Sequence, residues 1–247
     1  MYWLLLATLV GGQFEVQPLD GQPVAGQLVG LDAKQVTLEL PNGRTSLATA
    51  EVLSISAWKS VASTAKPKVW IDLTDGSRVA AEQYTTASGK ARIGLPGGET
   101  IEVPIREIAS VQLQPGSAAL APQWSKILEQ KAQSDMLVAV KGDTLDYHKG
   151  VIRDVTDQHV QFDLDGDVLN VKREKVYGLS YFHAADGEAP EAPCMVQEAD
   201  GSRWAARSVT LSGKLQWTSP SGRTMERELA KIAKIDLSRG KIVFLSD

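Results

Sequence analysis

The chain is poor in the residues that most often build catalytic and metal sites. Its 247 residues include one cysteine and three histidines. The single cysteine, Cys194, excludes an intramolecular disulfide framework and a cysteine-rich zinc site. Three scattered histidines leave little material for histidine-based catalysis. We therefore expect no catalytic, cofactor-binding or metal-binding residues and no cofactor, and we predict that the protein is not an enzyme.

A surplus of positive charge is also missing. There are 26 lysines and arginines against 30 aspartates and glutamates, a formal net charge of −4. Proteins that bind nucleic acid through its phosphates carry a basic surplus on at least one face. The charge balance therefore predicts no nucleic-acid partner.

The apolar run at residues 2–10 is too short to cross a membrane as a helix, which takes about 20 residues. Its length fits the hydrophobic region of a secretory signal, although no lysine or arginine precedes it, and the small residues Gly11 and Gly12 follow it. We predict a signal peptide at residues 1–12, export to the periplasm, cell envelope or exterior, and no membrane span afterwards. A buried first strand or a docked hydrophobic helix is the alternative.

Turn glycines recur along the chain at nearly equal spacing. Asp-Gly, Asn-Gly and similar pairs favour tight hairpins, because their residues tolerate positive φ, and short alternating runs of apolar residues flank them. Two such glycines per copy, 22, 22, 24 and 21 residues apart, indicate about four tandem copies of about five short strands. The pairs are Gly21 and Gly43, Gly76 and Gly98, Gly142 and Gly166, and Gly201 and Gly222.

The alternation predicts an all-β fold. A five-stranded sheet with one apolar face can bury that face only by curling or by stacking on a neighbour. We therefore expect tandem small five-stranded barrels of the SH3-like or Sm-like kind. Residues 26–32 and 36–40 resemble the second and third strands of an Sm module, without the basic or aromatic cluster that RNA-binding Sm rings use.

One segment reads as a helix. Pro122 suits a first helical turn, and Trp124, Ile127 and Leu128 fall on one face. The pattern predicts a helix near residues 122–133 that packs on the third copy. We expect the copies to pair as 14–113 and 134–247. The predicted boundaries are 1–12 signal peptide, 13–57 module 1, 66–114 module 2, 115–134 helical linker, 135–183 module 3 and 192–247 module 4.

An acidic loop superficially matches a calcium site. The loop has acidic residues at positions 1, 3, 5 and 12, as a calcium-binding loop does. A calcium-binding loop has glycine at position 6, however, and this sequence has Val168 there. A solvated hairpin turn at Asp165-Gly166 is therefore favoured. The acidic residues concerned are Asp163, Asp165, Asp167 and Glu174.

Other candidate groups have simpler interpretations. His148 and His159 could share a metal across two strands, but a third ligand is not evident. Cys194 follows a proline and lacks a nearby histidine or basic cluster, which favours a core position. The remaining pairs, Asp72 with Asp75 and Asp143 with Asp146, flank turns, and Ser110 and Ser180 lack a Gly-x-Ser-x-Gly setting.

Six tryptophans could supply a sugar-stacking platform, since flat rings match the apolar faces of pyranoses. Trp70, Trp204 and Trp217 fall in strands at expected core positions. Trp58, in a linker, is the one expected to be exposed.

These features resemble a known family. The chain resembles the N-terminal repeat region of bacterial exported proteins with an NPCBM-type (novel putative carbohydrate-binding module) domain. The similar features are an export signal, residues 26–32 (GQLVGLD), residues 51–55 (EVLSI), residues 69–73 (VWIDL) and residues 240–247 (GKIVFLSD). In that family the last segment leads into a carbohydrate-binding jelly roll, whose sugar-binding residues have no counterpart here. The chain is expected to be either a piece of a longer protein or a set of repeats that act alone.

The resemblance implies a non-catalytic scaffold or interaction region, accessory to carbohydrate binding at the cell envelope. Its partner would be a carbohydrate-binding domain continuing the chain or another envelope protein, and the oligomeric state is open. A direct glycan-binding module is one alternative. An envelope glycan hydrolase is a second, disfavoured because no set of acid, base and nucleophile recurs.

Overall fold

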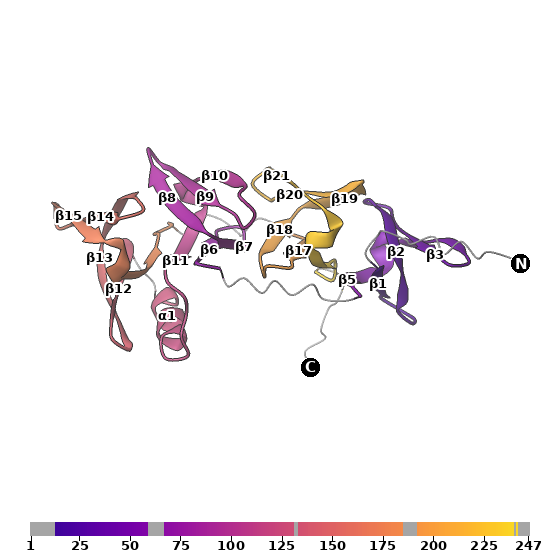
Figure 1. Ribbon diagram of the computed structural model, residues 1–247, viewed down its shortest axis with the longest axis horizontal. Coiled ribbons are helices and arrows are strands. Elements are labelled where there is room, and N and C mark those ends of the chain that lie inside the picture. The colour runs from indigo at the N-terminus through magenta and orange to yellow at the C-terminus, as the bar shows by residue number, and fades with distance from the viewer. Residues whose placement is uncertain (1–12, 59–66, 131–132, 185–191, 240, 242–247) are drawn as a thin grey trace, which may run out of the picture. The chain divides into compact units, whose positions relative to one another are not determined.

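The computed structural model describes residues 13–58, 67–130, 133–184, 192–239 and 241. The predicted signal peptide at residues 1–12 lies outside the described residues, as do most of residues 58–65, between predicted modules 1 and 2, and of residues 184–191, between predicted modules 3 and 4. The all-β class is confirmed, because the described elements are mostly strands, with antiparallel pairings and one α-helix (Figure 1).

Copies 1 and 3 have the same order of elements. Each is a run of four strands, a 3-10 turn and a fifth strand that returns beside the first. Copy 1 contains β1 (Gln13–Pro18), β2 (Val24–Leu31), β3 (Gln35–Leu40), β4 (Gly43–Ala48), η1 (Thr49–Glu51) and β5 (Val52–Ala57). Copy 3 contains β12 (Asp135–Lys141), β13 (Thr144–Val155), β14 (His159–Leu164), β15 (Asp167–Lys172), η3 (Arg173–Lys175) and β16 (Val176–Ser180).

Copies 2 and 4 repeat this order with the second strand interrupted, at Glu82 and Arg207 respectively. Copy 2 contains β6 (Val69–Leu73), β7 (Arg78–Ala81), β8 (Gln83–Ala87), β9 (Lys90–Gly94), β10 (Thr100–Pro104), η2 (Ile105–Glu107) and β11 (Ile108–Gln112). Copy 4 contains β17 (Cys194–Glu198), β18 (Arg203–Ala206), β19 (Ser208–Ser212), β20 (Lys214–Thr218), β21 (Thr224–Arg227), η4 (Leu229–Lys231) and β22 (Ile232–Asp236).

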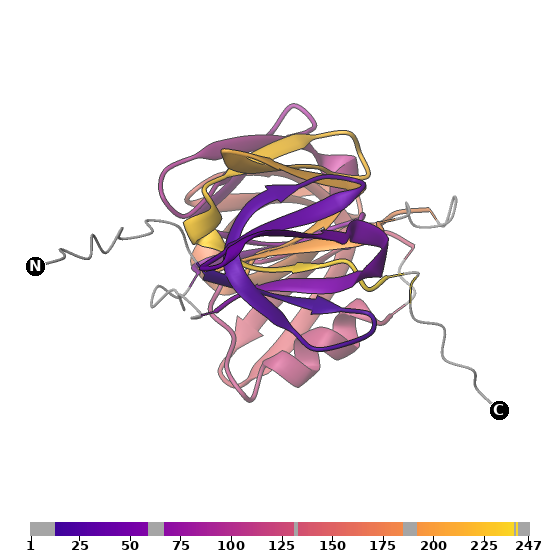
Figure 2. The same ribbon diagram turned by 90° about the vertical axis from the view of Figure 1, so that its right-hand side faces the viewer.

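The core follows the predicted alternation. In copy 1, Phe14 and Val16 of β1 are buried with Leu28 of β2 and Leu38 of β3, and the strands are strongly bent (Figure 2). The predicted hairpin turns are also confirmed. Positive φ occurs at every turn glycine named above: Gly21, Gly43, Gly76, Gly98, Gly142, Gly166, Gly201 and Gly222.

Separate closed barrels are not evident. The described pairings of copy 1 give the strand order β4-β3-β2-β1-β5, in which the two outer strands do not pair with each other. Instead, the fifth strand of one copy forms an antiparallel pair with the fifth strand of another copy. The sheets are therefore open, and the copies are joined edge to edge.

Two compact units result, and they differ from the predicted pairs. Unit 1 comprises described residues of copies 1 and 4 (13–58, 192–199, 205–239 and 241), and unit 2 comprises copies 2 and 3 with residues 200–204. The expected pairing of 14–113 and of 134–247 is wrong. The reason is that hydrogen bonds between sheet edges select the partner, and adjacency in the sequence does not.

The two units are assembled in the same way. In unit 1, β5 pairs with β22 antiparallel, with Ile55 opposite Ile235. In unit 2, β11 pairs with β16 antiparallel, with Val111 opposite Leu179. A second bridge joins the second strands, β2 with β19 and β13 with β8. Copy 1 in unit 1 therefore corresponds to copy 3 in unit 2, and copy 4 corresponds to copy 2.

The predicted helix is present as α1 (Ala121–Leu128), which ends before residue 133. Trp124 and Ile127 are buried against Met136 and Tyr177 of copy 3, with Leu128 partly buried beside them. The rings of Trp124 and Tyr177 meet edge to face, 5.7 Å apart. The predicted packing of the helix on the third copy is confirmed. Among the described residues, the chain has no helix long and apolar enough to cross a membrane.

Candidate functional site

The acidic loop of copy 3 is a hairpin turn whose carboxylate is already in use. Asp163 accepts a hydrogen bond from the N–H of Gly166 at 3.1 Å and forms an ion pair with Arg153 at 2.6 Å. The Arg153 side chain is the main cause that lowers the pKa of Asp163. Asp165 has a φ of +53° in the turn. Among the described residues, no three histidine, cysteine or acidic side chains gather as metal ligands would.

The two strand histidines are not brought together. His148 on β13 lies opposite Leu137, whereas His159 on β14 lies next to Val160, which faces Val155. His148 and Val155 are seven residues apart on the same strand. A metal shared by His148 and His159 is therefore not supported by this arrangement.

The turn-flanking carboxylates are engaged in local structure. Asp72 pairs with Arg78 at 3.0 Å and accepts a hydrogen bond from the Ser110 hydroxyl at 2.9 Å. Asp75 accepts the N–H of Ser77 at 2.9 Å, as turn aspartates do. These contacts give Asp72, Asp75 and Ser110 structural roles.

The tryptophans divide as predicted, with one exception. Trp204 and Trp217 are buried, and Trp58 is 53% exposed. Trp70 was expected in the core, but it is only half-buried, because Val69, Ile71 and Leu73 take the buried face of β6 and Trp70 lies on the opposite face. The Arg78 guanidinium lies over its ring there, 4.9 Å from the centroid.

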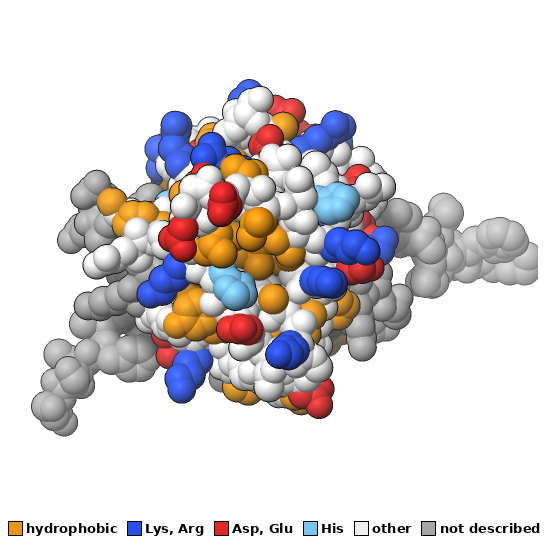
Figure 3. All heavy atoms as spheres, turned by 90° about the vertical axis from the view of Figure 1, so that its left-hand side faces the viewer, with side chains coloured by type: hydrophobic (Ala, Val, Ile, Leu, Met, Phe, Trp, Pro, Cys, Tyr) orange, Lys and Arg blue, Asp and Glu red, His pale blue; other side chains and the backbone are white. Residues whose placement is uncertain are grey.

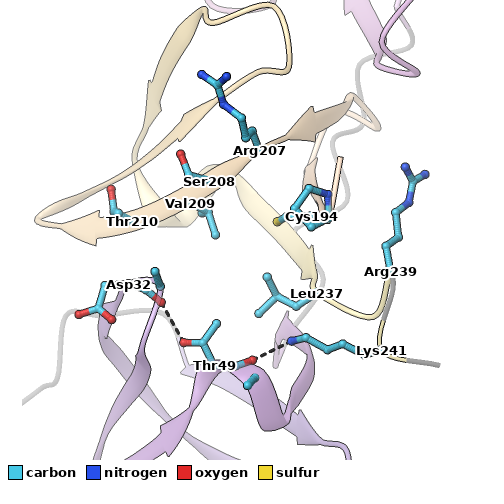
Figure 4. Close-up of a pocket in the computed structure, with 13 residues that line it drawn as sticks. Asp32, Thr49, Cys194, Arg207, Ser208, Val209, Thr210, Leu237, Arg239 and Lys241 are labelled. Atoms are coloured by element: carbon cyan, nitrogen blue, oxygen red, sulfur yellow. Dashed lines mark hydrogen bonds between the residues drawn. The ribbon is translucent and has the colours of Figure 1, made fainter. Parts of the chain in front are cut away.

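A concave site in unit 1 is a cavity of about 290 Å³. It lies between the β2–β3 turn and η1 of copy 1 on one side, and β19 and the residues after β22 on the other (Figure 4). Its lining residues are Asp32, Ala33, Thr49, Ala50, Pro193, Cys194, Arg207, Ser208, Val209, Thr210, Leu237, Arg239 and Lys241. Apart from Cys194, the sequence analysis had singled out none of these residues.

Cys194 forms part of the cavity wall. It is the first residue of β17, it is 3% exposed, and its sulfur points into the space (Figure 4). Burial raises the pKa of its thiol to about 12. The prediction that Cys194 is a buried residue is confirmed, and a protonated thiol gives the cavity a weakly polar surface and no nucleophile.

Lys241 closes one side of the cavity. Its ammonium donates to the backbone carbonyl of Thr49 at 2.7 Å (Figure 4). It also donates to the carbonyl of Val52 at 2.7 Å. Thr49 is the first residue of η1 and Val52 directly follows it, so the ammonium ties together the two ends of this turn. Desolvation lowers the pKa of Lys241. This lysine therefore holds the wall in place and has little capacity left for a ligand.

Two arginines at the rim are free of such contacts. Arg207 interrupts the second strand of copy 4, and Arg239 follows β22, and both side chains are exposed. Within the described chain, neither guanidinium has an acidic partner within 4.0 Å. The one acid on the wall, Asp32, accepts the N–H groups of Lys34 and Gln35, which lower its pKa. The rim therefore favours anions.

No protein-family model matches the chain, and no curated protein matches it.

Proposed function

We propose that the protein is an exported, non-catalytic scaffold built from four five-stranded modules of the SH3-like or Sm-like kind. It acts as an interaction region at the cell envelope, accessory to carbohydrate binding. The observation that carries this proposal is the edge-to-edge pairing of fifth strands. In both units, two fifth strands from different copies form an antiparallel ladder. A chain whose modules assemble through sheet edges is suited to binding other β-structures in the same way.

The module assignment is supported by strand order. Copies 1 and 3 each run as a four-strand meander, then a 3-10 turn, then a last strand that pairs with the first. This is the order expected of Sm-like modules. Edge-to-edge joining of the modules also explains why sheets of this size are stable, because each alone buries little surface.

Further edges are available for a partner. Among the described strands, β4 pairs with β3 and β15 pairs with β14, so one side of each carries unpaired backbone groups. Val168 and Leu169 of β15 are 53% and 43% exposed. Figure 3, which faces the β13–β15 region, shows hydrophobic side chains gathered on this face. An extended segment of an envelope protein would extend the sheet there and cover these side chains.

The location and the link to carbohydrate rest on the sequence. The apolar run at residues 2–10 supports export, and the resemblance of residues 26–32, 51–55 and 69–73 to the repeat region of NPCBM-containing proteins supports a role beside a sugar-binding domain. Fusion of residues 1–13 to a reporter that is active only outside the cytoplasm tests export. A silent reporter would contradict it.

Binding of the purified full chain to insoluble polysaccharides distinguishes a scaffold without sugar binding of its own from a direct glycan-binding module. Peptidoglycan, chitin and cellulose are incubated with increasing protein, and the bound fraction is measured. A scaffold that relies on a partner for sugar binding leaves the protein in the supernatant at every concentration. Saturable retention on any of the three polymers would overturn the scaffold-only proposal.

Exposure of Trp58 favours direct glycan binding as the second candidate. Its ring is 53% exposed and free to stack on a pyranose. If this candidate is right, Trp58→Ala abolishes retention on the polysaccharide. The matched control is Phe182→Ala, which removes an aromatic ring of comparable exposure, 43%, from the other unit.

A further inference from the structure

Because the two units are assembled in the same way, their residues can be matched one by one. In unit 1 the N–H of Thr49 donates to the carbonyl of Lys34 at 3.0 Å. In unit 2 the N–H of Arg173 donates to the carbonyl of Gln158 at 2.8 Å. Thr49, the first residue of η1, therefore corresponds to Arg173, the first residue of η3.

The second matched pair lies on the second strands of copies 4 and 2. Arg207 and Glu82 interrupt these strands. The N–H of Arg207 donates to the carbonyl of Thr218 on β20, and the N–H of Glu82 donates to the carbonyl of Gly94 on β9, each at 2.8 Å. Val209 and Tyr84 both lie two residues beyond the interruption. Val209 in unit 1 therefore corresponds to Tyr84 in unit 2.

The third matched pair lies at the ends of the fifth strands. Ile55 and Leu179 occupy the central position of the two ladders that join the copies. Two residues farther along are Ala57 in unit 1 and Tyr181 in unit 2. All three matched positions therefore carry a small side chain in unit 1 and a large one in unit 2.

In unit 2 the three large side chains lie close together. Tyr84 and Tyr181 are 0% and 6% exposed, and their hydroxyl oxygens are 2.9 Å apart. The Arg173 guanidinium donates to the carbonyls of Tyr84 and Thr156, at 2.8 and 3.0 Å. In this part of unit 2, two buried phenol rings lie beside a half-buried guanidinium.

In unit 1 the corresponding place is the cavity. Val209 and Thr49 line it, as does Asp32, which matches Thr156 because the two residues make the same turn hydrogen bond. The cavity thus lies where the Tyr84 ring and the Arg173 guanidinium of unit 2 are replaced by the smaller Val209 and Thr49, whereas Ala57 is not among its lining residues. The space is open to solvent on one side, so a ligand can enter it and cover its apolar wall.

We propose that this cavity is a binding site for a small organic anion with an aromatic body and one carboxylate. The walls of Ala33, Ala50, Pro193 and Leu237 are apolar, and the matched site of unit 2 shows that this space accepts aromatic rings. At the rim, unit 1 has Arg207 at the position that Glu82 occupies in unit 2. Glu82 forms an ion pair with Lys68 at 2.9 Å.

The charge at the rim selects the sign of the ligand. Arg207 and Arg239 are exposed and have no acidic partner among the described residues, so each can donate two parallel hydrogen bonds to a carboxylate. Asp32 is held by backbone N–H groups of its own turn and does not neutralise them. A carboxylate at the rim and a ring in the interior satisfy both parts of the site.

The test compares three probes that share a ring and differ in charge. Phenylacetate, 2-phenylethanol and 2-phenylethylammonium are titrated into the full chain by calorimetry. We expect phenylacetate to bind at least about tenfold more tightly than the other two, the gain typical of a charge-assisted hydrogen bond. Equal affinities, or no binding of phenylacetate, would overturn the proposal.

Variants that copy unit 2 into unit 1 locate the site. In the full chain, Thr49→Arg, Ala57→Tyr and Val209→Tyr together should fill the cavity, abolish phenylacetate binding and leave the melting temperature equal or higher. Val209→Tyr alone is the second variant if the triple variant does not fold. Arg207→Glu keeps the cavity and should lose the preference for the anion. Undiminished binding by a folded, filled variant would show that the ligand binds elsewhere.

Discussion

The hydroxyl groups of Tyr84 and Tyr181, from two different copies, hydrogen-bond to each other at 2.9 Å in the interior of unit 2. Burial raises the pKa of both phenols, so both stay protonated at any ordinary pH. One hydroxyl donates to the other at a place where both side chains are buried. The pair therefore ties copy 2 to copy 3 by a contact that neither copy could make alone.

Tyr84→Phe should lower the free energy of unfolding by about 1–3 kcal/mol, because the Tyr181 hydroxyl loses its buried partner. The double change with Tyr181→Phe should cost less than the sum of the single changes, since no hydroxyl is then left alone. Urea unfolding followed by circular dichroism measures both. Tyr147→Phe, at a half-buried ring, is the control, and strict additivity of the two changes would contradict the pairing.

Glu198 and Arg227 form an ion pair at 2.7 Å inside copy 4, with side chains only 8% and 7% exposed. Glu198→Gln should destabilise the protein by about 3–5 kcal/mol, because the buried arginine would lose the carboxylate charge that faces it. The matching residues of copy 2 are Leu73 and Val103. We expect the double change Glu198→Leu with Arg227→Val to be far less costly than the single change, as measured by urea unfolding.

Gly178 is required by the packing of α1. A Cβ atom there would lie 2.6 Å from the Trp124 ring and 2.8 Å from the Val111 carbonyl oxygen. Gly178→Ala should therefore destabilise unit 2 by about 1–3 kcal/mol through overpacking. Gly30→Ala, at another strand glycine where the nearest atom is 3.4 Å away, is the control and should change stability by less than about 0.5 kcal/mol. Equal effects in thermal unfolding would contradict this account.

Cys194 should make stability depend on pH in the alkaline range. Burial raises the pKa of its thiol to about 12, against about 8.5 in an unfolded chain. A raised pKa stabilises the folded state fully below pH 8.5 and loses that contribution as the pH rises towards 12. At pH 10 the loss should be about 2 kcal/mol. Urea unfolding at pH 7 and pH 10 measures it, and the Cys194→Ala variant should lack this part of the change.

Local order could be predicted from the sequence because it depends on near neighbours. Alternation placed Phe14 and Val16 in the core, and turn glycines such as Gly43 and Gly76 have the positive φ that their hairpins require. Spacing along residues 122–128 predicted α1 and its buried Trp124. The burial of Trp70 was predicted wrongly because it lies on the face of β6 opposite the buried Val69 and Ile71.

The cavity could have been suspected only from a comparison of copies. Val209 and Thr49 look ordinary in the sequence, and their significance lies in the larger Tyr84 and Arg173 at matching positions. Matching them requires knowing that copy 4 takes the role of copy 2 and that copy 1 takes the role of copy 3, which depends on the ladders of β5 with β22 and of β11 with β16.

By itself, the sequence determined an all-β chain with one helix, four sets of hairpins and a core of alternating apolar residues, because period, turn chemistry and helix spacing act over a few residues. Only the tertiary structure decided which copies pair and that unit 1 encloses a cavity. Partner choice depends on hydrogen bonds and side-chain fit between strands as distant as Ile55 and Ile235, and such contacts leave no periodic trace in the chain.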